Sequence, residues 1–119
     1  MQLLSCNLIC TLGWGYLSNF GYPEYYRGST DCRWTIRSTH GRRVRVTILD
    51  LSIRSVLHGE RECKDVLTVT QDKRLLLNKC GEVEEPLVVE SSGDELNLTL
   101  SVKSTFIPKR GLLAFFTGD

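Results

Sequence analysis

The chain has little of several features that mark common functional classes. Its net charge is only +1, from 15 lysines and arginines against 14 aspartates and glutamates, so it lacks the basic excess of nucleic-acid-binding domains. It has two histidines, His40 and His58, and neither stands at zinc-ligand spacing from a spare cysteine. No stretch approaches the roughly 18 apolar residues needed to cross a bilayer. These deficits argue against a nucleic-acid binder, a zinc protein and a membrane-spanning segment.

Helical periodicity is also missing, and strand-like alternation takes its place. No window of about 11 residues repeats its apolar positions with a helical period. The segment 96–102 alternates most clearly, because its leucines and Val102 point one way while its polar residues point the other. Strands are expected at 32–37, 44–48, 66–70, 75–77, 86–90, 96–102 and 111–117. Many short strands divided by Gly, Asn, Asp and Ser predict an all-β fold made of two packed sheets.

The length of 119 residues, without a linker, low-complexity tract or internal repeat, predicts one domain over residues 1–119. The apolar first ten residues lack a basic leader and a small-residue cleavage site, so we do not interpret them as a secretion signal. We expect the chain to be a piece of a larger secreted or membrane-anchored protein.

Cysteines are the most informative residues that the chain does have. Four of them, Cys6, Cys32, Cys63 and Cys80, stand at domain-scale spacings that are typical of a disulfide framework in an extracellular module. Spacing alone does not decide which cysteine pairs with which. The fifth cysteine, Cys10, is left over from an even set.

Sequence motifs along nearly the whole chain resemble those of CUB domains. The segment from Gly15 to Tyr26 is similar to the family pattern Gly-x-Ile/Leu-x-Ser-Pro-x-Tyr-Pro-x-x-Tyr. Five further pieces follow in the family's order: Cys32-Arg33-Trp34-Thr35-Ile36, the alternating run Val44 to Leu51, Cys63-Lys64-Asp65, Cys80-Gly81, and the closing run Gly111 to Phe116. Six pieces in order make the resemblance specific.

This resemblance implies a jellyroll-like, antiparallel β-sandwich stabilised by disulfides. It also implies the pairings Cys6–Cys32 and Cys63–Cys80, although Cys10 is an alternative partner for Cys32. If Cys10 is left over, it is either a buried small hydrophobic residue or the source of an interchain disulfide.

Many CUB domains bind Ca²⁺ at one end of the sandwich through three carboxylates, and here the resemblance places Arg54 and Lys103 at two of those positions. Only Asp65 keeps its carboxylate. We therefore expect no metal and no cofactor, with Arg54 or Lys103 neutralising Asp65. Glu60 and Glu62 are alternative oxygen donors, but we interpret them as solvated loop charges.

The resemblance implies a non-catalytic, extracellular protein-interaction module that works without calcium. Ser52, Ser55, His58 and Asp65 lie close in sequence, yet no nucleophile elbow or triad-like context surrounds them, so we expect no enzyme activity. We expect the end carrying Arg54, His58, Asp65 and Lys103 to bind an acidic protein or a neighbouring domain.

An alternative function is binding of an anionic carbohydrate such as a glycosaminoglycan, as in adhesin-like CUB domains. The run from His40 to Arg45 clusters cations near a turn, although we favour the interpretation that it is a hairpin turn with one strand face in water. A third alternative is a structural spacer.

Other side chains are candidates for surface roles. The sequon Asn97-Leu98-Thr99 places a glycosylation acceptor on the outward face of a strand. Trp34 is expected in the core. The candidates for exposed aromatic contacts are Phe20, Tyr25, Tyr26 and Phe106, although some of them must pack inside.

Overall fold

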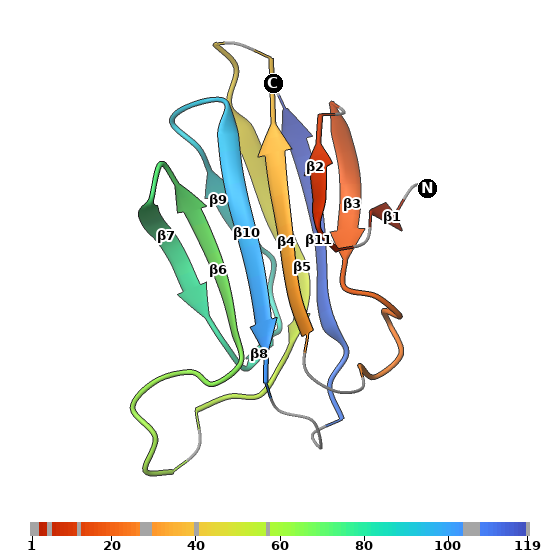
Figure 1. Ribbon diagram of the computed structural model, residues 1–119, viewed down its shortest axis with the longest axis vertical. Coiled ribbons are helices and arrows are strands. Elements are labelled where there is room, and N and C mark those ends of the chain that lie inside the picture. Colours follow the sequence, from red (N-terminus) through yellow and green to blue (C-terminus); the bar gives the residue numbers. More distant parts are fainter. Residues whose placement is uncertain are drawn as a thin grey trace.

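Two β-sheets pack face to face in the computed structural model, which describes residues 3–4, 6–11, 13–26, 30–39, 41–56, 58–103 and 108–118. Sheet A has the order β1 (Leu3–Leu4), β3 (Trp14–Ser18), β11 (Gly111–Gly118), β5 (Val44–Ser52) and β8 (Glu82–Val83), and β9 (Leu87–Glu90) also pairs with β5. Sheet B has the order β2 (Leu8–Cys10), β4 (Thr30–Arg37), β10 (Glu95–Val102), β6 (Val66–Gln71) and β7 (Arg74–Lys79). Figure 1 shows the two layers, and the all-β prediction is confirmed.

The seven predicted strands are present, with small shifts at their ends. The strand at 96–102 becomes β10, which lies in the middle of sheet B between β4 and β6. Four short strands, β1, β2, β3 and β8, were not predicted, because β1, β2 and β8 have only two or three residues and Gly15 interrupts the alternation of β3. Two pairings, β1 with β3 and β2 with β4, are parallel, since the chain changes sheet between β1, β2 and β3. The described part of the chain contains no helix suited to spanning a membrane.

The core lies between the sheets and is filled by the inward side chains of the alternating strands. Trp34 and Phe116 are its largest fully buried members, as expected for Trp34. Along β10, Leu96, Leu98 and Leu100 are fully buried while the residues between them are half-buried. Removal of this apolar surface from water is the main stabilising contribution to the fold.

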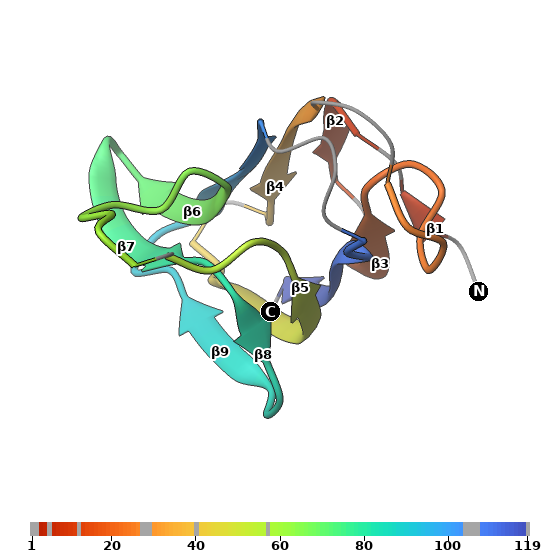
Figure 2. The same ribbon diagram turned by 90° about the horizontal axis from the view of Figure 1, so that it is seen from below.

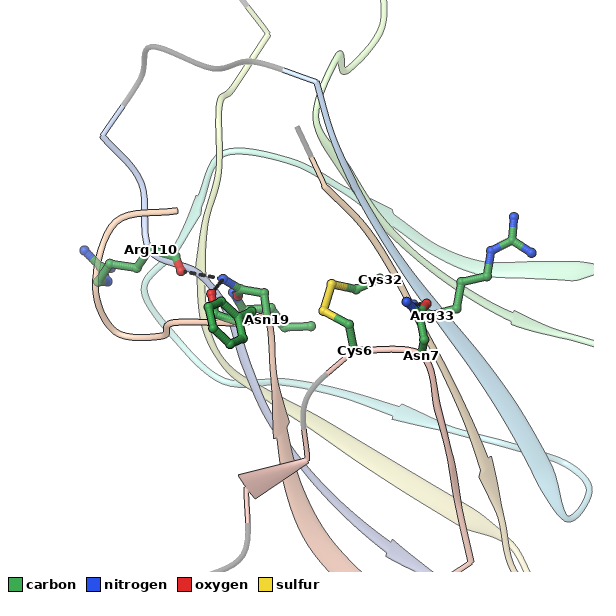
Figure 3. The surroundings of a disulfide bond; sticks show 8 residues. Cys6, Asn7, Asn19, Cys32, Arg33 and Arg110 are labelled. Atoms are coloured by element: carbon green, nitrogen blue, oxygen red, sulfur yellow. Dashed lines mark hydrogen bonds between the residues drawn. A yellow bond between two sulfur atoms is a disulfide. The ribbon is translucent and has the colours of Figure 1, made fainter. Parts of the chain in front are cut away.

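Two disulfides add to the core. They join Cys6 to Cys32 and Cys63 to Cys80, which is the pairing that the family resemblance implied. The bonds close stretches of 26 and 17 residues, for which chain-entropy models give roughly 3 kcal/mol each. Figure 3 shows the first of them, where the chain entering β2 lies against β4.

The fifth cysteine, Cys10, is a free thiol that is only 2% exposed. Burial raises the pKa of the Cys10 thiol, which keeps it protonated and unreactive. Of the two interpretations of Cys10, the structure therefore favours the buried hydrophobic residue over the interchain disulfide.

A buried amide joins the end of β3 to the start of β11. The backbone N–H of Leu112 donates to Asn19 Oδ1 at 2.6 Å, and Asn19 Nδ2 donates to the carbonyl of Arg110 at 3.2 Å. Figure 3 shows the Asn19 side chain turned toward Arg110. Gly111 lies between these two partners with φ of 98°, a backbone conformation that favours glycine. Asn19 is therefore the link that aligns the closing strand with the loops below it.

Candidate functional site

The loops that leave β3, β5 and β10 meet at one end of the sandwich, with the loops that enter β6 and β11. We call this region the loop end and define it as residues 19–26, 53–56, 58–65, 103 and 108–110. Figure 1 shows it at the bottom of the molecule, and Figure 2 shows it face on. It contains all four residues that the sequence predicted for the binding site.

Asp65 lies at the centre of the loop end and is fully buried. The backbone N–H of Lys103 donates to Asp65 Oδ1 at 2.9 Å, which connects the start of β6 to the end of β10. The Tyr26 phenol lies near Asp65: burial first, and then the Asp65 charge, raises the pKa of Tyr26 to about 12. The Tyr26 N–H also donates to the Lys109 carbonyl at 3.0 Å. Asp65 thus joins the start of β6 to the end of β10, with the Tyr26 ring nearby.

Arg54 does not neutralise Asp65, which corrects one prediction. Its guanidinium instead pairs with Glu60 Oε2 at 2.9 Å, and the two side chains are only 15% and 18% exposed. The loop folds back on itself through Gly59, whose φ is 87°, and this brings residues six apart together. Glu60 was interpreted as a solvated charge, and this is wrong because Arg54 covers it.

Lys103 and His58 are exposed on the loop end. Lys103 contacts Asp65 through its backbone, and its side chain forms no ion pair with Asp65 among the described residues. The expectation that Lys103 neutralises Asp65 by charge is therefore wrong as well. Glu62 is exposed, as predicted.

In a second network of charged and polar groups, the cationic side chains of Lys109 and Arg110 are paired with acidic residues. Arg110 donates two hydrogen bonds of 3.1 Å to the Asp50 carboxylate, and the Tyr22 hydroxyl donates a third at 2.5 Å. Arg110 holds the pKa of Asp50 below its usual value, whereas burial and then Asp50 raise the pKa of Tyr22 to about 12. Lys109 pairs with Glu82 at 2.9 Å. These cations are thus committed to neighbouring acids.

Other cationic side chains of the loop end remain exposed to solvent. Arg61, Lys64 and Lys103 are exposed, and none of them forms an ion pair within the described ranges. Arg61 and Lys64 line a shallow hollow together with Gly59, Glu60 and Glu62. The positive charge available to a partner therefore comes from these residues and not from Arg54.

Two aromatic side chains project from the loop end. Phe20 is 85% exposed and Tyr25 is 60% exposed, as predicted. Tyr26 was predicted to be exposed with them, but it is half-buried because its hydroxyl reaches toward Asp65. Phe106 lies outside the described residues. Aromatic side chains are enriched at protein interfaces.

A second aromatic group, not predicted from the sequence, lies on the outer face of sheet A. Trp14 is 58% exposed and packs edge-on against Tyr16, with ring centroids 6.5 Å apart. Tyr16 in turn contacts Phe115 across the strand pair at 4.9 Å. The signal was present, because Trp14 and Tyr16 are spaced by two in a strand, but the intervening Gly15 hid the alternation.

The basic run at 41–45 is less positive than its sequence indicates. Arg45 pairs with Glu90 on the neighbouring strand at 2.6 Å. Arg42 and Arg43 line a hollow that also contains Asp94. His40 lies outside the described residues. Neighbouring acids thus offset the charge that motivated the glycan-binding alternative.

The described residues Ser52, Ser55 and His58 form no catalytic arrangement. Ser52 is 1% exposed, donates to Glu82 at 3.1 Å and accepts from the Arg110 N–H, while His58 is exposed on the loop. In the described part of the chain, no hydrogen bond joins His58 to Ser52 or Ser55. These features define a disulfide-bonded β-sandwich of the kind that serves as a binding module.

Comparison with known proteins places this sandwich in a family. The CUB domain family model matches residues 6–115, and the chain belongs to the CUB family. CUB domains are generally extracellular, non-catalytic modules for protein interaction.

The relatives are large proteins. The chain is 29% identical over 94 residues to the adhesion G-protein coupled receptor G6 of Danio rerio and 27% identical over 100 residues to cubilin of Sus scrofa. These matches cover 79% and 83% of this chain but only 8% and 3% of the relatives.

Solved structures share the fold. The full extracellular region of zebrafish Gpr126 superposes with a TM-score of 0.81 at 24% identity, covering 96% of this chain and 15% of that one. The second CUB domain of MASP-1 bound to Ca²⁺ gives 0.80 at 19% identity, covering 94% and 98%.

Proposed function

We propose that this CUB domain is an extracellular, non-catalytic module that binds a protein partner through its loop end without calcium. The observation that carries the proposal is the way the loop end is held together. Asp65 accepts the Lys103 amide, and Arg54 covers Glu60, so contacts within the chain do what a metal does in other domains of this fold. A surface organised in this way is ready to bind without a cofactor.

The residues of the loop end do not fit calcium. Calcium takes six to eight oxygen ligands, several of them carboxylates. Among the described residues, no group of three or more His, Cys, Asp or Glu side chains is arranged to hold a metal. The buried Asp65 stands where the resemblance expects one carboxylate, while Arg54 and Lys103 stand at the other two positions.

Calcium is therefore expected to leave the stability of the domain unchanged. A ligand that binds only the folded state must raise the thermal midpoint. We expect the same midpoint in EDTA and in millimolar Ca²⁺, measured by differential scanning calorimetry. The second CUB domain of MASP-1 is the positive control. A clear rise for the present chain would restore the calcium-dependent mode and end this proposal.

The proposed partner is an acidic protein surface that also carries an apolar patch. Phe20 and Tyr25, on the loop that follows β3, offer apolar area that a partner removes from water, and Arg61, Lys64 and Lys103 offer positive charge on other segments of the loop end. In Figure 2 the loop after β3 and the loop before β6 lie on opposite sides of the loop end, so a partner that uses both must span it. Exposed positive charge mainly accelerates association with acidic partners and selects against basic ones. The proposed binding surface differs from the site predicted from the sequence, because Arg61 and Lys64 provide its positive charge instead of Arg54.

Substitutions at the loop end are expected to weaken binding while leaving the fold intact. The probe is an array of purified secreted proteins and receptor ectodomains, screened with the wild-type domain and then titrated with variants. Phe20→Ala and the double variant Lys64→Glu/Lys103→Glu are each expected to weaken binding about tenfold or more, equivalent to about 1.4 kcal/mol.

Trp14→Ala is the matched control, because Trp14 is as exposed as Tyr25 but lies on the outer face of sheet A. It is expected to bind normally. Loss of binding by Trp14→Ala with retention by the loop-end variants would move the site to sheet A. No binding to any protein on the array would favour the structural spacer.

The anionic-glycan alternative has less support. Heparin affinity needs a concentrated positive potential. Glu90 and Asp94 lie beside the arginines of residues 42–45, and the aromatic residues of the loop end lie at the other end of the strands from that turn.

A further inference from the structure

Asn97 lies at the middle of the outer face of sheet B. It is on the central strand β10, directly opposite Thr35 of β4 and Thr70 of β6. Its neighbours along the chain, Leu96 and Leu98, are fully buried, so the alternation turns Asn97 outward. The half-buried Asn97 is the first residue of the sequence Asn97-Leu98-Thr99.

The hydrogen bonding of Asn97 leaves its nitrogen available. The Thr35 hydroxyl donates to Asn97 Oδ1 at 2.9 Å. Within the described part of the chain, no hydrogen bond uses Asn97 Nδ2 as a donor. An N-linked sugar is attached at Nδ2 and leaves Oδ1 as an acceptor, so the bond from Thr35 survives the modification. The fold therefore orients the amide for a sugar instead of blocking it.

The surface around Asn97 has room for a sugar, and exposed apolar side chains lie within its reach. The neighbours of Asn97 across the strands, Thr35 and Thr70, are short, as is Thr99 on β10, while on the other side Glu95 is held in an ion pair with Arg37 at 2.7 Å. One cross-strand row continues from Thr35 to Ile9 of β2 and from Thr70 to Leu75 of β7. Ile9 is 60% exposed and Leu75 is 54% exposed. Each lies two strands from Asn97, about 10 Å away.

We infer that Asn97 carries an N-linked glycan that lies across the outer face of sheet B, between Ile9 and Leu75. The donor is a lipid diphosphate-linked oligosaccharide. Asn97 Nδ2 forms a bond to the anomeric carbon as the bond from that carbon to the diphosphate oxygen breaks. The diphosphate leaves with its electron pair, and Nδ2 loses a proton. The inference rests on the extracellular location in the proposed function, but not on calcium independence or on the loop end.

The test is expression of the 119-residue chain behind a secretory leader in mammalian cells. Intact mass is measured before and after treatment with peptide-N-glycosidase F, in both medium and lysate, so that retained variants are also scored. Wild type is expected to lose the mass of one glycan. Asn97→Gln and Thr99→Ala are expected to show no loss, whereas Thr99→Ser keeps the sequon and is expected to behave as wild type.

The position of the glycan is tested by hydroxyl-radical footprinting. Oxidation of Ile9 and Leu75 is expected to be lower in the glycosylated chain than in Asn97→Gln, while oxidation of Phe20 on the loop end stays unchanged. Equal oxidation of Ile9 and Leu75 would overturn the placement of the glycan. A secreted, disulfide-bonded wild-type chain without glycan would overturn the site itself and leave the proposed function standing.

Discussion

Gly111→Ala is expected to lower the free energy of unfolding by about 3 kcal/mol, a large share of the roughly 5–15 kcal/mol that stabilises a small domain. Two costs combine at this position. The φ of 98° strains any residue with a Cβ, and a Cβ built there overlaps the side-chain amide of Asn19. Because Asn19 aligns β3 with β11, moving it also breaks the hydrogen bond to Leu112. Urea unfolding monitored by Trp fluorescence measures the loss.

Gly21→Ala separates the two costs. Gly21 has a similar φ of 85°, but nothing lies within 4 Å of the Cβ that alanine would add. This variant is expected to lose only about 1 kcal/mol, from backbone strain alone. In an Asn19→Ala background, Gly111→Ala is expected to cost no more than Gly21→Ala. Equal losses for Gly111→Ala and Gly21→Ala in the wild-type background would refute the steric argument.

Asp65→Ala is expected to destabilise the domain by about 2 kcal/mol and to weaken partner binding as well. Asp65 is fully buried, and its removal leaves the part-buried Lys103 amide without the acceptor it has at 2.9 Å. Tyr26 loses its negatively charged neighbour at the same time. Stability is read from urea unfolding, and binding from the array partner identified with the wild-type domain.

Asp65→Asn is the matched control, because it keeps the Oδ1 acceptor and removes only the charge. It is expected to lose less than half as much stability as Asp65→Ala. An Asp65→Ala variant within about 0.5 kcal/mol of wild type, a range typical of surface positions, would show that Asp65 does not organise the loop end.

Alkaline titration gives both variants a second readout. The pKa of Tyr26 is raised from 10 to about 12 in the folded chain, so its contribution to stability is present below pH 10 and is lost as the pH rises to 12. Burial is the largest cause and remains in both variants, but the contribution of the Asp65 charge disappears. The alkaline loss of stability is therefore expected to be smaller in Asp65→Asn than in wild type.

Different parts of the fold were predictable to different degrees. The strands from β4 onward that run for four residues or more carry a period-2 pattern or follow a turn residue, and the sequence shows them. The short strands at the N-terminal side carry no such pattern, because their pairing partners decide that they are strands. Parallel pairing of β2 with β4 is a property of the folded sheet and not of three residues.

The sequence predicted where the candidate site lies but not which contacts its residues make. The resemblance located Arg54, His58, Asp65 and Lys103 at one end of the sandwich, and the structure brings their loops together there. It did not predict that Arg54 pairs with Glu60 six residues later, or that Lys103 contacts Asp65 through its backbone. Loops have no period, so the partner of a loop charge depends on how the backbone turns.

The sequence by itself determined the family, the β-sandwich, the burial of Trp34 and the outward orientation of Asn97. Each of these depends on residue types at regular or motif spacing along the chain, which local physics imposes. Only the tertiary structure decided which cations are neutralised, which aromatic residues remain in water and which groups Asp65 holds. Those outcomes depend on distances between segments tens of residues apart, as between Asp65 and Lys103 or Asn19 and Leu112, which the packing of the two sheets sets.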